Sequence, residues 1–240
     1  MIAPALAAQG VTRQFRNGAG VFDLDLELHT GQIVALVGLN GAGKSTMMRI
    51  LLGMLHPDRG EVRLEDHPLD AAPREQWARV GHLVEYPLAY PELTVRRNLQ
   101  LSARMRGIHD VDAAVTAIIT EFALEEYVDR RARTLSLGNR QRVGLAAALQ
   151  HDPRVIVLDE PTNALDPAGV IRLRESLLGR AEAGAAILVS SHHLDEVARI
   201  ADRIVVINRG RLIGDLDPET QDIEHGFFEI VRIDDERGVR

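Results

Sequence analysis

The 240-residue sequence contains no cysteine, and its 28 basic residues include a single lysine, Lys44. Without cysteine the chain can form no disulfide, no thiolate nucleophile and no zinc–thiolate site, which favours a reducing compartment. The remaining basic residues are all arginine, and a general preference for arginine does not explain the one lysine. Lysine and arginine differ where a compact point charge must fit a tight site, so Lys44 is a candidate functional residue.

Long apolar runs and an excess of positive charge are also missing. The longest uncharged stretch, residues 30–43, has 14 residues and four glycines, whereas a membrane helix needs about 20 apolar residues. The first residues lack the basic flank and apolar run of a secretion signal. The net charge of −7 argues against a dedicated nucleic-acid binder. We therefore expect a soluble chain that reaches a membrane only through a partner.

The apolar pattern predicts an α/β fold. Residues 22–28 alternate apolar and acidic, as in a half-buried antiparallel strand. Short apolar runs at 33–37, 155–158, 186–190 and 203–207 predict buried strands, and helical patterns cover 44–55, 94–133, 139–150, 167–183 and 193–200. Strands that alternate with helices indicate a parallel sheet with flanking helices. The polar segment after residue 215 shows no clear pattern.

A glycine-rich segment, GLNGAGKST, lies between a predicted strand and a predicted helix. Its spacing fits the phosphate loop, in which backbone N–H groups and a helix N-terminus surround phosphate oxygens. Lys44 would reach the β- and γ-phosphates of ATP, and the Ser45 hydroxyl would bind Mg²⁺. The predicted nucleotide-binding residues are Gly38, Leu39, Asn40, Gly41, Ala42, Gly43, Lys44, Ser45 and Thr46.

Two adjacent carboxylates, Asp159 and Glu160, follow the apolar run VIVL. They are expected at the carboxyl end of a strand, where ligands bind in open α/β sheets. Asp159 is predicted to serve Mg²⁺, and Glu160 to orient or deprotonate the attacking water. Consecutive residues on a strand point to opposite sides, which would give the two carboxylates separate positions.

Further segments resemble the ATP-binding cassette (ABC) ATPases, over residues 5–214. LSLGNRQRVGLAAAL, which contains Ser136 and Gly138, lies about twenty residues before LDEP and resembles the family signature LSGGQ. TNALDP resembles the D-loop and places Asp166 there, and VSSHHLDEV places His192 at the switch histidine. Phe15 lies where the family has an aromatic that stacks on adenine. Residues 80–99 and the SLG signature are similar to ATPases of bacitracin-type and lantibiotic self-protection exporters.

The resemblance implies a P-loop NTPase core with a mostly parallel sheet, an N-terminal antiparallel β subdomain and an inserted α-helical subdomain. It places the ATPase domain at 1–225, the insert at about 92–138 and a short tail at 226–240. Ser136 and Gly138 would act on ATP held by a second copy, so that a homodimer encloses two ATP molecules. A separate transmembrane permease would carry peptide antibiotics or drugs, with this chain on the cytoplasmic face of the membrane and no nucleic-acid partner.

Two positions depart from the family pattern. Glu85 stands where most members have glutamine, and a carboxylate is the better Mg²⁺ ligand but has no N–H donor. Glu85 is therefore predicted as a metal and catalytic residue, unless the exchange is neutral. In the signature, Leu137 and Asn139 replace glycine and glutamine, which bears on hydrolysis more than on nucleotide binding.

Two other functions stay open. A soluble ABC ATPase acting on nucleic acid or the ribosome usually has two cassettes, a long coiled-coil insert or a basic surface, and this chain has one cassette and negative charge. A nucleotide-dependent regulator without turnover is motivated by Leu137 and Glu85.

Overall fold

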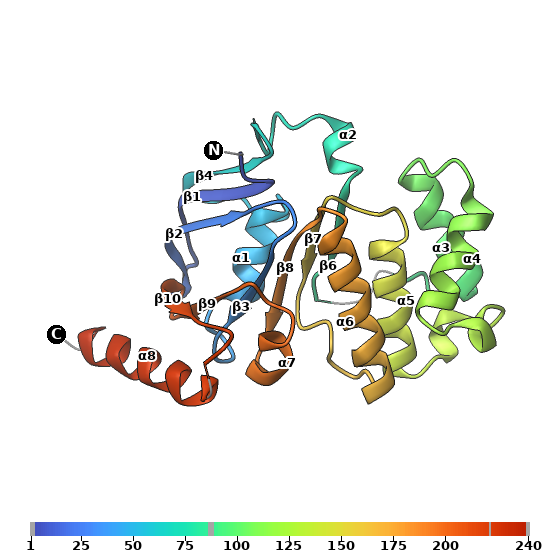
Figure 1. Ribbon diagram of the computed structural model, residues 1–240. Helices are drawn as coiled ribbons and strands as arrows, with labels where there is room; N and C mark the ends of the chain where they lie inside the picture. The colour runs from blue at the N-terminus through green and yellow to red at the C-terminus, as the bar shows by residue number, and fades with distance from the viewer. Residues whose placement is uncertain (1–2, 86–88, 221, 239–240) are drawn as a thin grey trace.

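Six strands form the central sheet of the computed structural model, which describes residues 3–85, 89–220 and 222–238. Their order is β10–β9–β3–β8–β7–β6 (Figure 1). All neighbouring strands are parallel except β10, which runs antiparallel to β9. This confirms the mostly parallel sheet. The strands are β3 (Ile33–Val37), β6 (Val80–Leu83), β7 (Val155–Leu158), β8 (Ala186–Ser191), β9 (Arg203–Asn208) and β10 (Arg211–Leu216).

A second sheet is antiparallel, in the order β2–β1–β4–β5. In β2, Leu24, Leu26 and Leu28 are buried and the acidic residues between them are exposed, as the alternation predicts. The partner strands of β2 carry no apolar pattern clear enough to predict them from the sequence. The four strands are β1 (Leu6–Gln14), β2 (Gly20–Leu28), β4 (Arg59–Leu64) and β5 (His67–Pro68).

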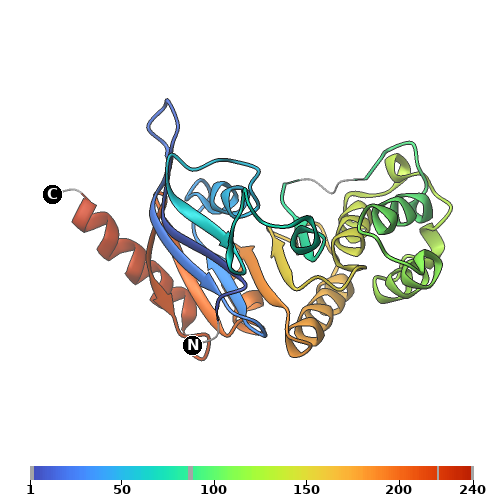
Figure 2. The same ribbon diagram turned by 90° about the horizontal axis from the view of Figure 1, so that it is seen from above.

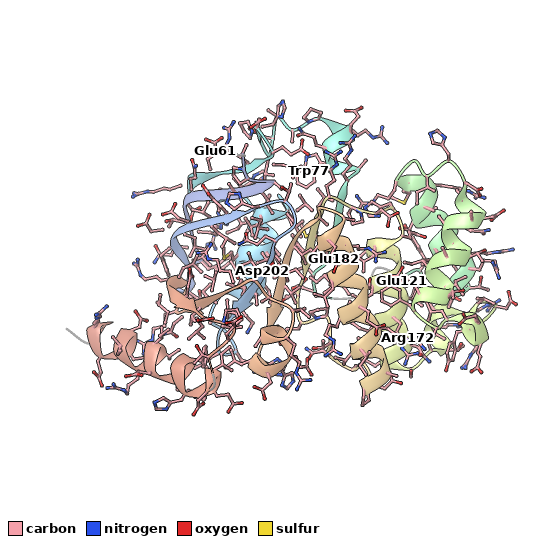
Figure 3. The ribbon with its side chains drawn as sticks, viewed as in Figure 1. Glu61, Trp77, Glu121, Arg172, Glu182 and Asp202 are labelled. Atoms are coloured by element: carbon pink, nitrogen blue, oxygen red, sulfur yellow. The ribbon has the colours of Figure 1, made fainter. Side chains whose placement is uncertain are left out.

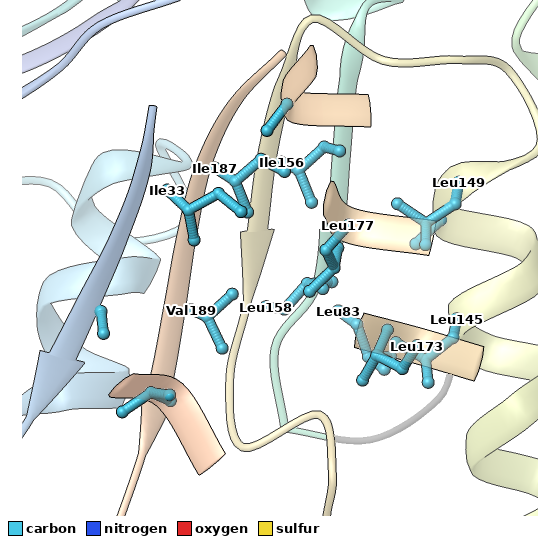
Figure 4. Close-up of a cluster of buried hydrophobic side chains, with 14 of the residues drawn as sticks. Ile33, Leu83, Leu145, Leu149, Ile156, Leu158, Leu173, Leu177, Ile187 and Val189 are labelled. Atoms are coloured by element: carbon cyan, nitrogen blue, oxygen red, sulfur yellow. The ribbon is translucent and has the colours of Figure 1, made fainter. Parts of the chain in front are cut away.

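The central sheet separates two apolar cores because successive residues of a buried strand face opposite sides. Val34, Leu36, Val157 and Leu188 pack towards α1 and the antiparallel sheet. The residues between them in sequence face the other helices, as the cluster in Figure 4 shows. Both faces of β3, β7 and β9 are therefore apolar, which is why these strands read as continuous apolar runs.

Eight α-helices occur within the described ranges. α1 ends earlier than the predicted residue 55, and Gly53 follows it with φ of +67°, a conformation that commonly ends helices. None of the described helices is both long and apolar enough to cross a bilayer. The helices are α1 (Lys44–Leu51), α2 (Arg74–Trp77), α3 (Val95–Met105), α4 (Val111–Glu121), α5 (Leu137–Leu149), α6 (Pro167–Glu182), α7 (Leu194–Ala198) and α8 (Ile223–Gly238).

Helices α3 and α4 form an arm that lies beyond α5, on the far side of the molecule from the antiparallel sheet (Figures 1 and 2). Together with two short 3₁₀ turns, they occupy the range of the predicted insert. One ion pair joins the arm to α6: Arg180 donates to Glu121, labelled in Figure 3, at 2.7 Å.

The last helix, α8, differs from the prediction of a short tail that starts at residue 226. The boundary falls inside α8, whose Phe227 and Val231 are buried in the core. The Asn208 side chain of β9 donates to Asp234 and Asp235, at 2.9 Å each. Residues 226–238 therefore belong to the same folded unit as the sheet.

Candidate functional site

The predicted phosphate loop connects β3 to α1. A Cβ atom on Gly38 would lie 2.4 Å from the backbone oxygen of Ile207, so a larger residue does not fit there. Gly43 precedes α1 with φ of +113°, which favours glycine. Lys44 begins α1; it is 7% exposed, and its Nζ donates to the Gly38 carbonyl oxygen at 2.7 Å. The loop therefore surrounds the Lys44 side chain and hydrogen-bonds its ammonium group.

The two predicted carboxylates lie just past the end of β7 and take different directions. Asp159 Oδ1 accepts a hydrogen bond from the Ser190 hydroxyl at 2.5 Å. Glu160 is 18% exposed, and its Oε1 lies 3.4 Å from Lys44 Nζ. The separation arises from the turn after Leu158, where Glu160 has φ of +46°, and not from the pleat of a strand as expected.

His192 lies beside the same carboxylate. Its Nδ1 is 2.7 Å from Glu160 Oε2, and its backbone N–H donates to that oxygen at 3.3 Å. The two oxygens of Glu160 thus contact the Lys44 ammonium on one side and the imidazole on the other. The structure brings together three of the four predicted catalytic residues.

A hollow of about 230 Å³ opens over this group. Residues 39–46 line it together with Asp159 and Glu160. Glycine-loop N–H groups, a helix N-terminus and a buried ammonium suit an anionic phosphate. The Ser45 hydroxyl and the Asp159 carboxylate supply oxygen donors of the kind that Mg²⁺ prefers. The donor set fits a nucleotide phosphate with a divalent cation.

The signature segment is in a different place. Ser136 is the N-cap of α5, and its Oγ accepts from the Asn139 N–H at 3.2 Å. A Cβ atom on Gly138 would lie 2.4 Å from the Ala164 carbonyl oxygen, so α5 begins against the loop 161–166. Neither Ser136 nor Gly138 is among the described residues that line the hollow.

Two residues that the sequence analysis missed connect α5 to the loop 161–166. Gln141 Nε2 donates to the Pro161 carbonyl oxygen at 3.1 Å, and Arg142 donates to Asp166 Oδ1 at 2.6 Å. The Arg142 hydrogen bond lowers the pKa of the Asp166 carboxyl, and the Gly169 N–H adds to that effect as Asp166 caps α6. In the sequence, Gln141 and Arg142 are the last two of four polar residues, 139–142, that precede an apolar helical run.

Phe15 and Glu85 also lie outside the described lining of the hollow. Phe15 follows β1, and the Arg13 guanidinium is 5.7 Å from its ring centre. Glu85 follows β6 with φ of +71° and forms an ion pair with Arg49 of α1. Part of the segment 80–99, residues 86–88, lies outside the described residues.

A larger hollow, of about 1120 Å³, lies between α6 and the loop 152–154, where β7 and β8 begin. Its Arg180 is paired with Glu121 and with the Ser176 hydroxyl. The parallel strands end at the opposite edge, which is where open α/β sheets bind ligands. The smaller hollow is therefore the candidate site.

Known proteins are similar to this chain in sequence. A profile of the family described as "ABC transporter" matches residues 21–163. The SkfA peptide export ATP-binding protein SkfE of Bacillus subtilis (strain 168) is 35% identical over 233 residues, which cover 95% of this chain and 96% of that protein. The bacitracin transport ATP-binding protein BcrA of Bacillus licheniformis is 34% identical over 207 residues, covering 86% and 68%.

A solved structure agrees with these relatives. It is described as an ATP binding subunit of an ABC transporter; the TM-score is 0.83 at 28% identity, covering 95% of this chain and 94% of that one. The matched profile includes the phosphate loop, the signature segment and both carboxylates, and the relatives span nearly the whole chain. The chain therefore belongs to the ABC transporter family, as an ATP-binding cassette.

Proposed function

We propose that this chain binds and hydrolyses ATP and thereby powers an exporter whose membrane-spanning part is a separate permease. The observation that carries the proposal is the contact of Glu160 with both Lys44 and His192 at the wall of the phosphate-sized hollow. Phosphoryl transfer depends mostly on positioning and electrostatic stabilisation, and this group offers a cation, a carboxylate base and an imidazole within a few ångströms.

Each residue has a distinct task in the proposed reaction. Lys44 exchanges its contact with Glu160 for the β- and γ-phosphates, which frees the carboxylate to orient the attacking water. His192 hydrogen-bonds the γ-phosphate. Ser45 and Asp159 would hold Mg²⁺, which would neutralise charge on the phosphates.

Ser136 and Gly138 stand apart from the hollow, and this supports a composite site. In the proposed homodimer, two copies face each other head to tail, and each signature closes the partner's nucleotide hollow. Phe15 stacks on adenine, and Asp166 contributes at the interface. Because Asp166 is fixed to Arg142, the loop 161–166 and the signature helix would move together.

The proposed cargo class rests on relatives that are similar over most of the chain, one assigned to bacitracin transport and one to SkfA peptide export. We propose antimicrobial peptides or drugs as cargo and the cytoplasmic face of the membrane as the location. The net charge of −7 supports the absence of a nucleic-acid partner.

The test uses two variants of the hollow. Glu160→Gln keeps the shape of the side chain and removes the base, so it should hold ATP and elute as a stable dimer in size-exclusion chromatography with Mg²⁺ and ATP. Lys44→Ala should lose nucleotide binding or turnover, and Arg97→Lys, an exposed position on α3, keeps its charge and serves as the folding control. A Glu160→Gln protein that stays monomeric at saturating ATP, or a Lys44→Ala protein with normal turnover, contradicts the proposal.

A regulator without turnover is the second candidate. The Glu85–Arg49 ion pair and the half-exposed Leu137 of the signature favour it. Glu85 acts as a metal ligand in the first proposal only after it leaves Arg49. Steady-state phosphate release measured with the co-purified permease separates the two: turnover identifies a motor, and nucleotide binding without release identifies a regulator.

A further inference from the structure

Ser190 of β8 contacts both carboxylate residues of the site at once. It is fully buried, at 0% exposure. Its hydroxyl donates to Asp159 Oδ1 at 2.5 Å and accepts from the Glu160 N–H at 2.9 Å. A serine hydroxyl has one proton and two acceptor lone pairs, so one side chain contacts both the proposed metal ligand and the proposed base.

The strand register explains why Ser190 is at this position. β8 lies between β3 and β7, with Ser190 paired to Leu36 and its neighbour Val189 paired to Leu158. Ser190 therefore lies level with the first residue after β7, at the edge of the sheet from which the phosphate loop starts.

Glu160 needs such support because its backbone is in the left-handed region, with φ of +46°. A non-glycine residue in that region is strained by about 1–2 kcal/mol. Its N–H has the Ser190 hydroxyl as acceptor, and its carboxylate then reaches Lys44 and His192. At Asp159, a short hydrogen bond to a charged acceptor withdraws negative charge from one oxygen.

We propose that Ser190 is a positioning residue, which holds the turn that aims Glu160 and moderates the charge that Asp159 offers to a cation. This inference rests on the proposed function. Without the hydroxyl, the Glu160 N–H loses its acceptor and Asp159 Oδ1 loses its donor. Catalysis should therefore weaken while the affinity for a divalent cation rises, a combination that general loosening of the fold does not produce.

The experiment compares Ser190→Ala with Ser176→Ala. Ser176 is also a buried serine whose hydroxyl is hydrogen-bonded, to Arg180, but it lies on α6 beside the larger hollow. Mn²⁺ serves as the spectroscopic probe in an electron paramagnetic resonance titration with ADP, and phosphate release gives kcat and KM. For Ser190→Ala we expect kcat to fall ~10–100-fold, as for a slightly misplaced catalytic group, with KM little changed and Mn²⁺ bound a few-fold more tightly.

A second pair of variants separates the hydroxyl from the shape of the side chain. Ser190→Thr and Ser190→Val have nearly the same volume and differ in the hydroxyl. Ser190→Thr keeps the hydroxyl, so its kcat and its Mn²⁺ affinity should be close to those of the wild type. Ser190→Val should show a lower kcat and tighter Mn²⁺ binding. This comparison also decides the question if Ser190→Ala does not fold.

The results distinguish this inference from the proposed function. If wild-type protein binds no Mn²⁺ with ADP, the proposed function fails. If wild-type protein binds them but Ser190→Ala behaves like Ser176→Ala, or Thr and Val behave alike, Ser190 has no positioning role. A fall in Mn²⁺ affinity in step with kcat would also overturn the inference, because it would indicate general damage to the site.

Discussion

Two groups of polar side chains flank the turn at residues 159–166, and they are built by different means. The nucleotide group, Lys44, Asp159, Glu160, Ser190 and His192, lies at the ends of β3, β7 and β8. The signature group, Gln141, Arg142 and Asp166, joins helix α5 to a loop. Lys44 is 7% exposed in the first group, and the Asp166 side chain is 55% exposed in the second.

The difference shows how each group is positioned. Parallel register fixes strand ends relative to one another to within a residue, so the nucleotide group is in place before any ligand arrives. The signature group depends instead on long side chains that reach from helix α5 to a loop. We expect substitutions where the helical arm meets α5 and β6 to alter the free energy of unfolding and the coupling of the signature to the nucleotide site. Substitutions in the nucleotide group should instead alter ATP hydrolysis.

The largest stability effect should come from two histidines at that junction, His82 of β6 and His151 after α5. Burial, with the Arg106 charge adding to it, lowers the pKa of each to about 4 from 6.5. Between these values the unfolded chain binds protons that the folded chain excludes, so stability falls as pH falls from 6.5 to 4. The loss approaches about 3 kcal/mol for each histidine.

Urea unfolding at pH 7.5, 6 and 5 checks this prediction. His151→Gln should reduce the pH dependence of the free energy of unfolding by about 1 kcal/mol per pH unit between pH 6 and 5, and by very little near pH 7.5. The exposed His109→Gln serves as the control. An unchanged slope in His151→Gln would show that this histidine is not kept neutral by the fold.

Two glycine-to-alanine substitutions should have opposite signs. At Gly138 a Cβ atom meets the Ala164 carbonyl oxygen, so alanine should destabilise by about 1–3 kcal/mol. At Gly179, within α6, a Cβ atom meets nothing within 4 Å, and alanine should stabilise by about 0.5–1 kcal/mol through helix propensity. Thermal unfolding measures both, and a Gly138→Ala variant that is no less stable than wild type would mean that α5 does not press on the loop 161–166.

The smallest effects are expected at Asp166. Asp166→Ala removes the α6 cap and should cost about 1 kcal/mol, whereas Asp166→Asn keeps a capping oxygen and loses only the charge paired with Arg142. Because the folded pKa is lowered, the contribution of the charge is complete above the usual pKa of an aspartate and is lost as pH falls through the folded value. In urea unfolding, Asp166→Ala should lower the free energy of unfolding by the same amount at pH 7 and at pH 5. If Asp166→Asn lowers it as much as Asp166→Ala does, the effect comes from the charge and not from the cap.

Much of the fold could be predicted from short patterns. The runs at 33–37 and 155–158 are β3 and β7 to the residue, because both faces of these strands are buried and every position must be apolar. β6 was not predicted, because its sequence VGHL contains a histidine and a glycine. The glycine packs against Ala148. α8 escaped because its apolar face is narrow and lies against β9 and β10, which the local sequence does not reveal.

The candidate site divides in the same way. Lys44, Asp159, Glu160 and His192 could be named because each belongs to a short motif next to a strand end. Ser190, Gln141 and Arg142 could not be assigned roles, because their partners lie 31, 20 and 24 residues away. Glu85 was recognised as unusual, but its pairing with Arg49 depends on how β6 and α1 lie together.

The spacing of glycines and apolar residues was enough to locate the phosphate loop, its single ammonium and the two carboxylates, because it confines them to strand ends and the start of a helix. Which atoms meet depends on how distant segments pack. Three features arise where distant segments pack: the turn that separates Asp159 from Glu160, the contacts of Ser190 with both residues, and the hydrogen bonds between α5 and the loop 161–166. Local propensity carries no information about such contacts.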